Sequence, residues 1–234
     1  MFTEDFYTRS DENFIFSKQQ GSDFAKNIAG DFNPLHDIDN SRFCIPGDLL
    51  FSVMLGEFGA SKQMHFDFQG MISGDMPVHF IQNDESIVAQ NDKNKQLLKL
   101  TKSGDITQDQ TFIEGLIRSY VAFSGKTFPH IIIRLMKQQG VMINTRKPMV
   151  IYDQMSLSLE SFSNVAPEVI LKDCDFDVTG KRGVVTMNFD IRASNESIGV
   201  GEKKIIMSSL RPYEQGEIDY LVDTYNKAKE SASF

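Results

Sequence analysis

Residues 24–36 read Phe24-Ala-Lys-Asn-Ile-Ala-Gly-Asp-Phe-Asn-Pro-Leu-His36, and this stretch decides the interpretation of the whole chain. Within it, Asp31 and His36 place a carboxylate and an imidazole close together in the sequence. Pro34 between them breaks a helix unless it opens one, and it restricts Asn33 to extended geometry. The spacing therefore predicts a turn in which Asn33 caps a short helix that begins at Pro34.

A turn of this kind can bring the two side chains to one point. A carboxylate and an imidazole that share one water molecule are the minimum equipment for adding water to a substrate. The same residue types are common in ordinary capped turns, because Asp and Asn side chains bond to nearby backbone groups. From the residues alone, a catalytic turn and a purely structural turn remain open as alternatives.

The segment resembles the signature of the MaoC-like, (R)-specific enoyl-CoA hydratases, a family with the hotdog fold. That signature has an aromatic residue, a short spacer, a small residue, and then Asp-x-Asn-Pro-Leu-His followed by an acidic residue. The resemblance covers roughly residues 14–125, with Gly47 as the glycine that opens the central helix and Gly74-Asp75 at the end of an aromatic strand. The residues that match the signature itself are Phe24, Gly30, Asp31, Asn33, Pro34, Leu35, His36, Asp37 and Asp39.

The resemblance implies hydration of a 2-enoyl thioester, or the reverse dehydration, with Asp31 as general base and His36 holding the same water. It implies substrate contacts at Asn33, Gly47 and Asp48. The substrate would be a coenzyme A or acyl carrier thioester, with no cofactor and no metal. Two alternatives stay open: a hotdog acyl-CoA thioesterase, and a non-catalytic protein that binds acyl groups. The connection from His36 to Gly47 is shorter than in the family, which favours the non-catalytic alternative.

The rest of the chain predicts the α+β class and a repeated architecture. Residues 48–59 are apolar on nearly every face, which is typical of a helix buried on all sides. Met64-x-Phe-x-Phe-Gln-x-Met71 is echoed by Met155-x-Leu-x-Leu-Glu-x-Phe162, and a proline precedes an apolar helix in both halves. We therefore expect a double hotdog, with two antiparallel sheets that are each wrapped around a central apolar helix. The predicted strands are 13–17, 64–71, 77–82, 86–90, 96–101, 111–123, 150–161, 168–177, 183–192 and 197–208.

Two units follow from this repeat. Residues 1–125 form the unit with the motif, and residues 126–234 form a degenerate unit without it. Enzymes of the resembled family place their site between two units, so one chain predicts one site, as a monomer with an internal pseudo-dimer or as a homodimer. The tail, 214–230, carries apolar residues at helical spacing and predicts an amphipathic helix packed on the body, with a partner-binding surface as the alternative.

Composition argues against several classes of function. The net charge of −8 argues against nucleic-acid binding. The apolar runs are too short to span a membrane, and the acidic N-terminal residues are not typical of a secretory signal. Cys44 and Cys174 give neither a disulfide framework nor a metal-ligand spacing, so we expect a cytoplasmic protein with reduced thiols. Lys172, Lys203 and Lys204 are expected to be solvated.

Overall fold

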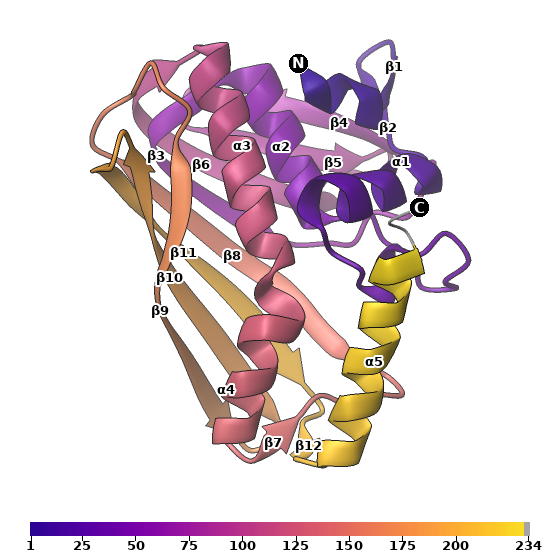
Figure 1. Ribbon diagram of the computed structural model, residues 1–234. Coiled ribbons are helices and arrows are strands. Elements are labelled where there is room, and N and C mark those ends of the chain that lie inside the picture. The colour runs from indigo at the N-terminus through magenta and orange to yellow at the C-terminus, as the bar shows by residue number, and fades with distance from the viewer. Residues whose placement is uncertain (232–234) are drawn as a thin grey trace.

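The computed structural model describes residues 1–231, and its central feature is one antiparallel sheet of ten strands with the long helices packed on one face (Figure 1). The strands run in the order β1-β2-β4-β5-β6-β3-β8-β11-β10-β9. Their bounds are β1 (Thr8–Ser10), β2 (Asn13–Ile15), β3 (Ala60–Phe68), β4 (Pro77–Gln82), β5 (Ser86–Asn91), β6 (Gln96–Thr107), β8 (Met149–Leu159), β9 (Glu168–Thr179), β10 (Arg182–Ala193) and β11 (Glu196–Ser208). A separate two-stranded sheet joins β7 (Val141–Met142) to β12 (Arg211–Pro212).

Strands β3 and β8 join the two halves of the chain in the middle of the large sheet. They pair antiparallel, with Met64 opposite Leu157 and Phe66 opposite Met155. These are the two segments whose sequences echo each other, so the repeated strands occupy equivalent places. The expectation of two separate sheets is wrong, because the backbones of β3 and β8 pair across the boundary and make one continuous sheet. Pairing these two strands also removes an exposed edge from each half.

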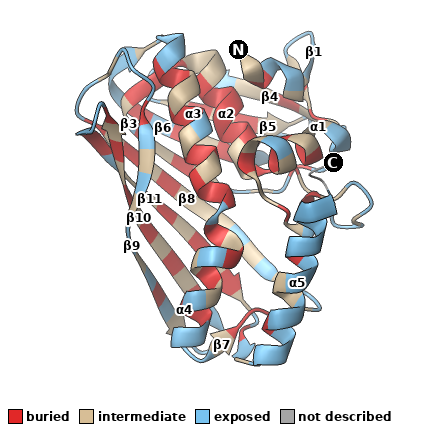
Figure 2. Cartoon of the chain, in the orientation of Figure 1, coloured by how far each residue is buried: buried red, intermediate tan, exposed pale blue. Residues whose placement is uncertain are grey.

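Helices cover one face of this sheet. Figure 2 shows that buried residues concentrate in α2, α3 and the strands beneath them, whereas α5 is largely exposed. The helices are α1 (Lys18–Asp23), α2 (Gly47–Phe58), α3 (Gln110–Gly125), α4 (Ile132–Gln138) and α5 (Gln215–Ser231), with the short 3-10 or π segments η1 (Phe2–Phe6), η2 (Phe24–Ala29), η3 (Pro34–His36) and η4 (Thr127–Ile131). Within residues 1–231, no helix combines the length and the apolar character that crossing a membrane requires.

Helix α2 is buried on all sides, as its sequence predicts. Every residue in 49–55 is buried. Ser52, the polar residue of that run, donates its hydroxyl to the carbonyl oxygen of Asp48 at 2.6 Å, which avoids the cost of an unpaired polar group in the core. The rings of Phe51 on α2 and Phe66 on β3 meet at 5.2 Å between centroids. The first half therefore has the hotdog arrangement of a sheet around a central helix.

The prediction of a strand at residues 111–123 is wrong, because this segment lies within α3. Its aromatic and β-branched residues favour a strand, but its buried side chains recur at helical spacing, as at Phe112 and Tyr120. Asp109 caps the helix, since its carboxylate accepts a hydrogen bond from the N–H of Phe112 at 2.7 Å. Helix α3 ends at Gly125, where the boundary between the two units is predicted, and η4 and α4 follow it along the chain. The boundary itself stays a prediction.

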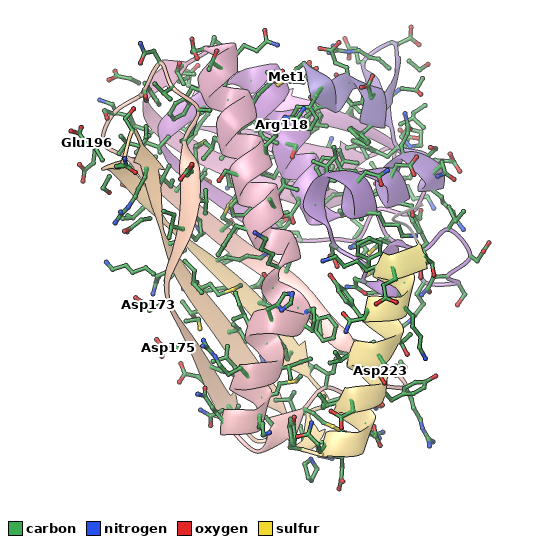
Figure 3. All side chains as sticks on the ribbon, viewed as in Figure 1. Met1, Arg118, Asp173, Asp175, Glu196 and Asp223 are labelled. Carbon is green, nitrogen blue, oxygen red and sulfur yellow. The ribbon has the colours of Figure 1, made fainter. Side chains whose placement is uncertain are left out.

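Charged side chains on the edge strand β9 and near the N-terminus lie at the outer parts of the molecule. Asp173 and Asp175, on the edge strand β9, are exposed and lie at the outer side of the sheet (Figure 3). Charges on an edge strand discourage pairing with another sheet. Near the N-terminus, the guanidinium of Arg118 on α3 lies 3.8 Å above the ring of Phe2, and this cation–π contact holds the N-terminal segment against the helices.

Candidate functional site

The stretch 24–36 folds into the kind of turn that its sequence predicts. Segment η2 ends at Gly30, which is left-handed with φ at 66°, a conformation that favours glycine. The N–H of Asp31 then donates to the carbonyl oxygen of Ala25 at 2.8 Å. The chain therefore changes direction immediately before Asp31, whose side chain faces His36 of η3.

Asn33 shapes the second part of the turn. Its side-chain oxygen accepts a hydrogen bond from the N–H of Leu35 at 3.1 Å, and Pro34 is the first residue of η3, so the predicted cap is confirmed. Its own N–H donates to Oδ1 of Asp31 at 2.9 Å. One residue thus starts the short helix and fixes one oxygen of the neighbouring carboxylate.

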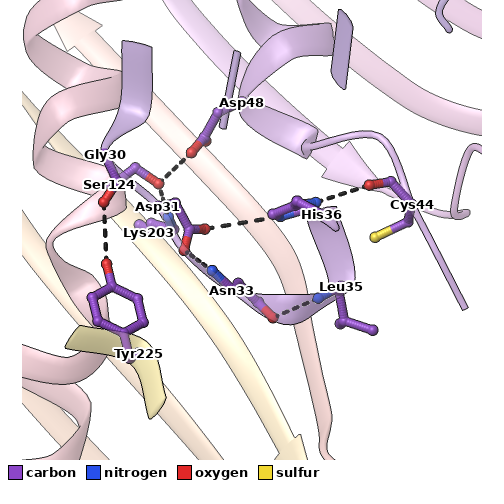
Figure 4. A network of polar contacts seen from close by, with 10 residues as sticks. All are labelled: Gly30, Asp31, Asn33, Leu35, His36, Cys44, Asp48, Ser124, Lys203 and Tyr225. Atoms are coloured by element: carbon purple, nitrogen blue, oxygen red, sulfur yellow. Dashed lines mark hydrogen bonds and ion pairs between the residues drawn. The ribbon is translucent and has the colours of Figure 1, made fainter. Parts of the chain in front are cut away.

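His36 and Asp31 face each other across this turn (Figure 4). Oδ2 of Asp31 lies 3.8 Å from Nε2 of His36, which is too long for a direct hydrogen bond and short enough for one bridging water. The other ring nitrogen, Nδ1, lies 2.8 Å from the carbonyl oxygen of Cys44. A carbonyl only accepts, so Nδ1 carries a proton, and whenever the ring is neutral Nε2 presents its lone pair towards the carboxylate. A single water molecule can donate one hydrogen to each of these acceptors.

The surroundings of Asp31 suit it to act as a base. Burial is the largest effect and raises the pKa of its carboxyl, and the nearby Asp48 carboxylate acts in the same direction. His36, the N–H of Asn33 and the Lys203 cation act in the opposite direction. A carboxylate whose pKa lies closer to neutrality can both take a proton and return it, as general acid–base catalysis requires.

The pair lies in the wall of a cavity of about 450 Å³, a volume typical of small-molecule sites. From the first half of the chain, the cavity is lined by the turn at residues 30–36, called the motif turn below, and by the first turn of α2. From the second half, it is lined by β8 and β11. Asp31, Asn33, His36, Gly47 and Asp48 all line this cavity. The structure therefore brings all five predicted site residues together, and their roles stay predictions.

The N-terminus of α2 opens onto the cavity at Gly47. Its N-cap residue is Pro46, and no side chain caps the helix, so the first backbone N–H groups are donors for a ligand. A Cβ at position 47 would lie 2.9 Å from the ring of Phe68 and 3.2 Å from that of Tyr152. Gly47 is the first residue of the central helix, as predicted. Because it has no side chain, a ligand can approach the helix backbone closely.

Lys203 on β11 also lines the cavity, so its expected solvation is wrong. Only 4% of the residue is exposed. Buried side chains alternate along β11, so that Lys203, Ile205 and Met207 share the face under the helices. The sequence contained a signal for this burial. Ile205 and Met207 alternate along the strand, and the same alternation places residue 203 on their buried face. Lys172, by contrast, is exposed as expected.

Ser124 and Asp48 connect Lys203 to the start of α2 (Figure 4). The hydroxyl of Ser124, near the end of α3, donates to Oδ2 of Asp48 at 2.5 Å, and Nζ of Lys203 donates to the Ser124 oxygen. The other oxygen of Asp48, Oδ1, is buried and has no hydrogen-bond partner among the described residues. Side chains from α2, α3 and β11 thus meet where the central helix begins.

Helix α5 holds the motif turn from outside. The hydroxyl of Tyr225 donates to the carbonyl oxygen of Gly30 at 3.1 Å. Its ring makes edge contacts with Phe32 and Phe128, at 5.9 and 5.4 Å between centroids. The predicted packing of the terminal helix on the body is confirmed, and the helix fixes the backbone immediately before Asp31.

A larger, more open groove of about 700 Å³ lies on the opposite face of the sheet and lacks the motif. His65 there contacts Ser156 (Nδ1 to Oγ, 2.7 Å) and Asp67 (Nε2 to Oδ1, 3.2 Å). The strands that carry these residues are paired on both sides, so their backbone donors serve the sheet and not a reacting oxygen. The smaller cavity is the stronger candidate site.

The described residues offer neither a metal centre nor a reactive thiol at the site. In residues 1–231, no group of three or more His, Cys, Asp or Glu side chains is placed to hold a metal ion. Cys44 and Cys174 are free thiols. Burial, together with the Asp31 carboxylate, raises the pKa of Cys44 to about 11, which keeps it protonated and unreactive.

Comparison with known protein families gives a match over residues 1–216, to a family described as "Protein of unknown function (DUF3581)". The chain belongs to this family. No curated protein matches its sequence. The assignment therefore places the chain among its relatives without attaching an activity to it.

Solved structures that resemble this DUF3581 protein share little of its sequence. A conserved hot dog fold protein of unknown function from Alicyclobacillus acidocaldarius has a TM-score of 0.48 and 7% identity, over 91% of this chain and 99% of that one. A MaoC-like dehydratase has a TM-score of 0.44 and 8% identity, over 86% and 97%. Acyl-CoA thioesterase II TesB2 from Mycobacterium marinum has a TM-score of 0.44 and 7% identity, over 92% and 99%. Similarities this distant indicate nothing about the activity of this chain.

Proposed function

We propose that this protein binds an acyl thioester in the cavity and adds water to a 2-enoyl thioester, or removes it from a 3-hydroxyacyl thioester. The observation that carries the proposal is the 3.8 Å separation of Asp31 Oδ2 and His36 Nε2 in a cavity wall that also holds the start of α2. One water fits between the pair, and the helix N-terminus offers donors to a carbonyl oxygen. Coenzyme A or an acyl carrier would supply the thiol.

The proposed reaction needs only this water and the two side chains. Asp31 takes a proton from the water, whose oxygen adds to carbon 3 of the enoyl group, while His36 Nε2 accepts the second hydrogen bond. Negative charge moves to the thioester oxygen, where the N–H groups of α2 stabilise it. The proton then passes from the pair to carbon 2, so the site returns to its starting state.

Hydrolysis of the thioester is the second candidate. Asp48, the second residue of α2, brings another carboxylate to the end of the helix that would receive the carbonyl oxygen. A water deprotonated there would attack the carbonyl carbon in place of carbon 3. Incubation with crotonyl-CoA separates the two reactions, because hydration removes the enoyl absorbance without free thiol and hydrolysis releases thiol. A non-catalytic acyl-binding protein would retain the ligand and give neither signal.

On the acid side of the pH profile, activity is expected to fall at a pH above the pKa of an ordinary aspartate, which is about 3.9. Asp31 must be ionised to act as base, and burial raises its pKa. Activity is therefore present above that raised pKa and is lost as the pH falls through it. A profile of kcat/KM against pH measures the position of this limb, and circular dichroism at each pH separates it from unfolding. A limb at the ordinary aspartate value would contradict the assignment of Asp31 as base.

Replacing Arg42 by alanine is expected to raise KM for a coenzyme A thioester by about fivefold, a size typical of an exposed ionic contact. Arg42 lines the cavity, is exposed, and forms no ion pair with any carboxylate of residues 1–231. Its guanidinium is therefore available to a phosphate of the coenzyme. An N-acetylcysteamine thioester carries no phosphate and serves as the matched control. A KM that rises equally for both substrates would show that Arg42 does not contact the coenzyme.

A further inference from the structure

Lys203 is a buried lysine in the cavity that forms no ion pair with any carboxylate of residues 1–231. Its neighbours on the same face of β11, Ile205 and Met207, are apolar and buried. An unpaired ammonium in such surroundings costs folding free energy, and an apolar side chain would not. The proposed water-activating pair also makes no use of this group, so its presence needs another explanation.

Two contacts hold the ammonium group in one place. Nζ donates a hydrogen bond to Oγ of Ser124, which in turn donates to Asp48 at the start of α2. Nζ also lies 4.2 Å from the centroid of the Tyr152 ring, within the range of a cation–π contact. Tyr152 is itself fixed by its hydroxyl contact with Tyr120 and by stacking on Phe68 at 4.0 Å between centroids. An ammonium has three N–H groups, so one of them remains for a ligand in the cavity.

The carboxylates near the cavity favour the charged form of Lys203 without forming an ion pair with it, so its ammonium is available to an anion. Burial lowers its pKa, while the carboxylates of Asp48 and Asp31 act in the opposite direction and favour the protonated form. Neither carboxylate neutralises the ammonium by direct contact. An anion that forms beside Nζ during a reaction would therefore be stabilised strongly, because the donor is already oriented and is buried.

We propose that Lys203 is a catalytic residue of this site, whose ammonium donates a hydrogen bond to the thioester oxygen and stabilises the negative charge that develops there. This inference rests on the proposed binding of an acyl thioester. It holds for both candidate reactions, since hydration places the charge on that oxygen as an enolate and hydrolysis as a tetrahedral oxyanion. Lys203 transfers no proton and stays charged throughout. The N–H groups at the start of α2 act on the same oxygen.

Kinetics of Lys203→Met, Lys203→Arg and Lys204→Met test the proposal. Lys203→Met keeps the length of the side chain and removes its charge, so kcat is expected to fall by about 10²- to 10³-fold with little change in KM. Lys203→Arg keeps a charge and should restore part of the rate. Lys204→Met is the matched control, because Lys204 lies on the other face of β11 and pairs with Glu202 at 2.9 Å. Its rate should equal that of the wild type.

The alkaline side of the pH profile gives a second measurement. The protonated amine is the active form, so the rate should fall as the pH rises through a pKa that lies below the ordinary lysine value. That limb should disappear in Lys203→Met and move to higher pH in Lys203→Arg, since a guanidinium stays charged. A wild-type limb that persists unchanged in both variants would overturn the proposal.

Binding of acetoacetyl-CoA tests the inference without turnover. The wild type should increase the enolate absorbance of the bound ligand at a given pH, and Lys203→Met should not, while both bind butyryl-CoA with similar affinity. Equal enolate absorbance and equal kcat in the two proteins, together with an inactive Asp31→Asn, would overturn the role of Lys203 and leave the proposed function standing. Failure of the wild type to bind either thioester would instead overturn the proposed function, and this inference with it.

Discussion

Replacing Asp31 by asparagine is expected to lower kcat for crotonyl-CoA hydration by about 10²- to 10⁴-fold, the contribution typical of a positioned general base. Asparagine keeps the size of the side chain, and its oxygen can still accept the hydrogen bond that the N–H of Asn33 donates at 2.9 Å. The geometry of the turn is therefore retained, but an amide takes no proton from water. Steady-state loss of the enoyl absorbance measures the difference.

Asp39→Asn is the matched control for this experiment. Asp39 is exposed and belongs to the same loop, so the substitution removes the same charge close to the site without touching the cavity wall. Its rate should equal that of the wild type. An Asp31→Asn variant that hydrates crotonyl-CoA as fast as the wild type would end the proposed mechanism and leave only the architecture.

Thermal unfolding separates a loss of catalysis from a loss of fold in Asp31→Asn. The raised pKa of Asp31 means that the folded protein binds this proton more readily than the unfolded chain. Stability therefore falls as the pH rises through the interval from the unfolded to the folded pKa, and above it the ionised carboxylate opposes folding. Asparagine has no charge to desolvate. The Tm of the variant at pH 7 should equal or exceed that of the wild type.

Strands could be located from the sequence because their pattern is local. The predicted strand at 77–82 is β4 as observed, and the one predicted at 183–192 is β10, which runs from Arg182 to Ala193. Alternating apolar residues bounded by turn residues define such segments. The same rule failed at 111–123, because branched and aromatic residues also occupy the buried face of a helix. There the repeat of apolar residues every three to four positions and the cap at Asp109 are the decisive signals.

Some residues of the site are close together in the sequence, and others come together only through the fold. Asp31 and His36 lie within one turn whose shape Asn33 and Pro34 dictate, so the sequence could bring them together. Asp48, Ser124 and Lys203 meet only because β3 pairs with β8 and lays β11 beside α3. A side-chain period of two defines the faces of a strand but not its partner. The resemblance placed the site between the two units, but the particular residues of the second half that line the cavity were outside the reach of the pattern.

Replacing Gly125 by alanine is expected to destabilise the protein by about 1–3 kcal/mol, the usual cost of forcing atoms into a packed interior. A Cβ at this position of α3 would lie 1.9 Å from the carbonyl oxygen of Ala29 and 2.8 Å from its carbonyl carbon. Both are backbone atoms, so no side-chain rotation relieves the overlap, and α3 must move away from η2. For a chain of this size, each 1 kcal/mol lowers Tm by about 2–4 °C, which calorimetry measures.

Moving α3 and η2 apart should also displace Asp31, because Ala29 directly precedes Gly30 and Asp31. A shift of about 1 Å at a catalytic group can cost about 100-fold in rate, so hydration by Gly125→Ala should fall even at temperatures where it remains folded. Gly216→Ala is the matched control, since a Cβ there meets nothing within 4 Å and alanine favours the helix α5. Its Tm and rate should equal or slightly exceed those of the wild type. If Gly125→Ala behaved like this control, the contact between α3 and η2 would not be what positions Asp31 in the cavity wall.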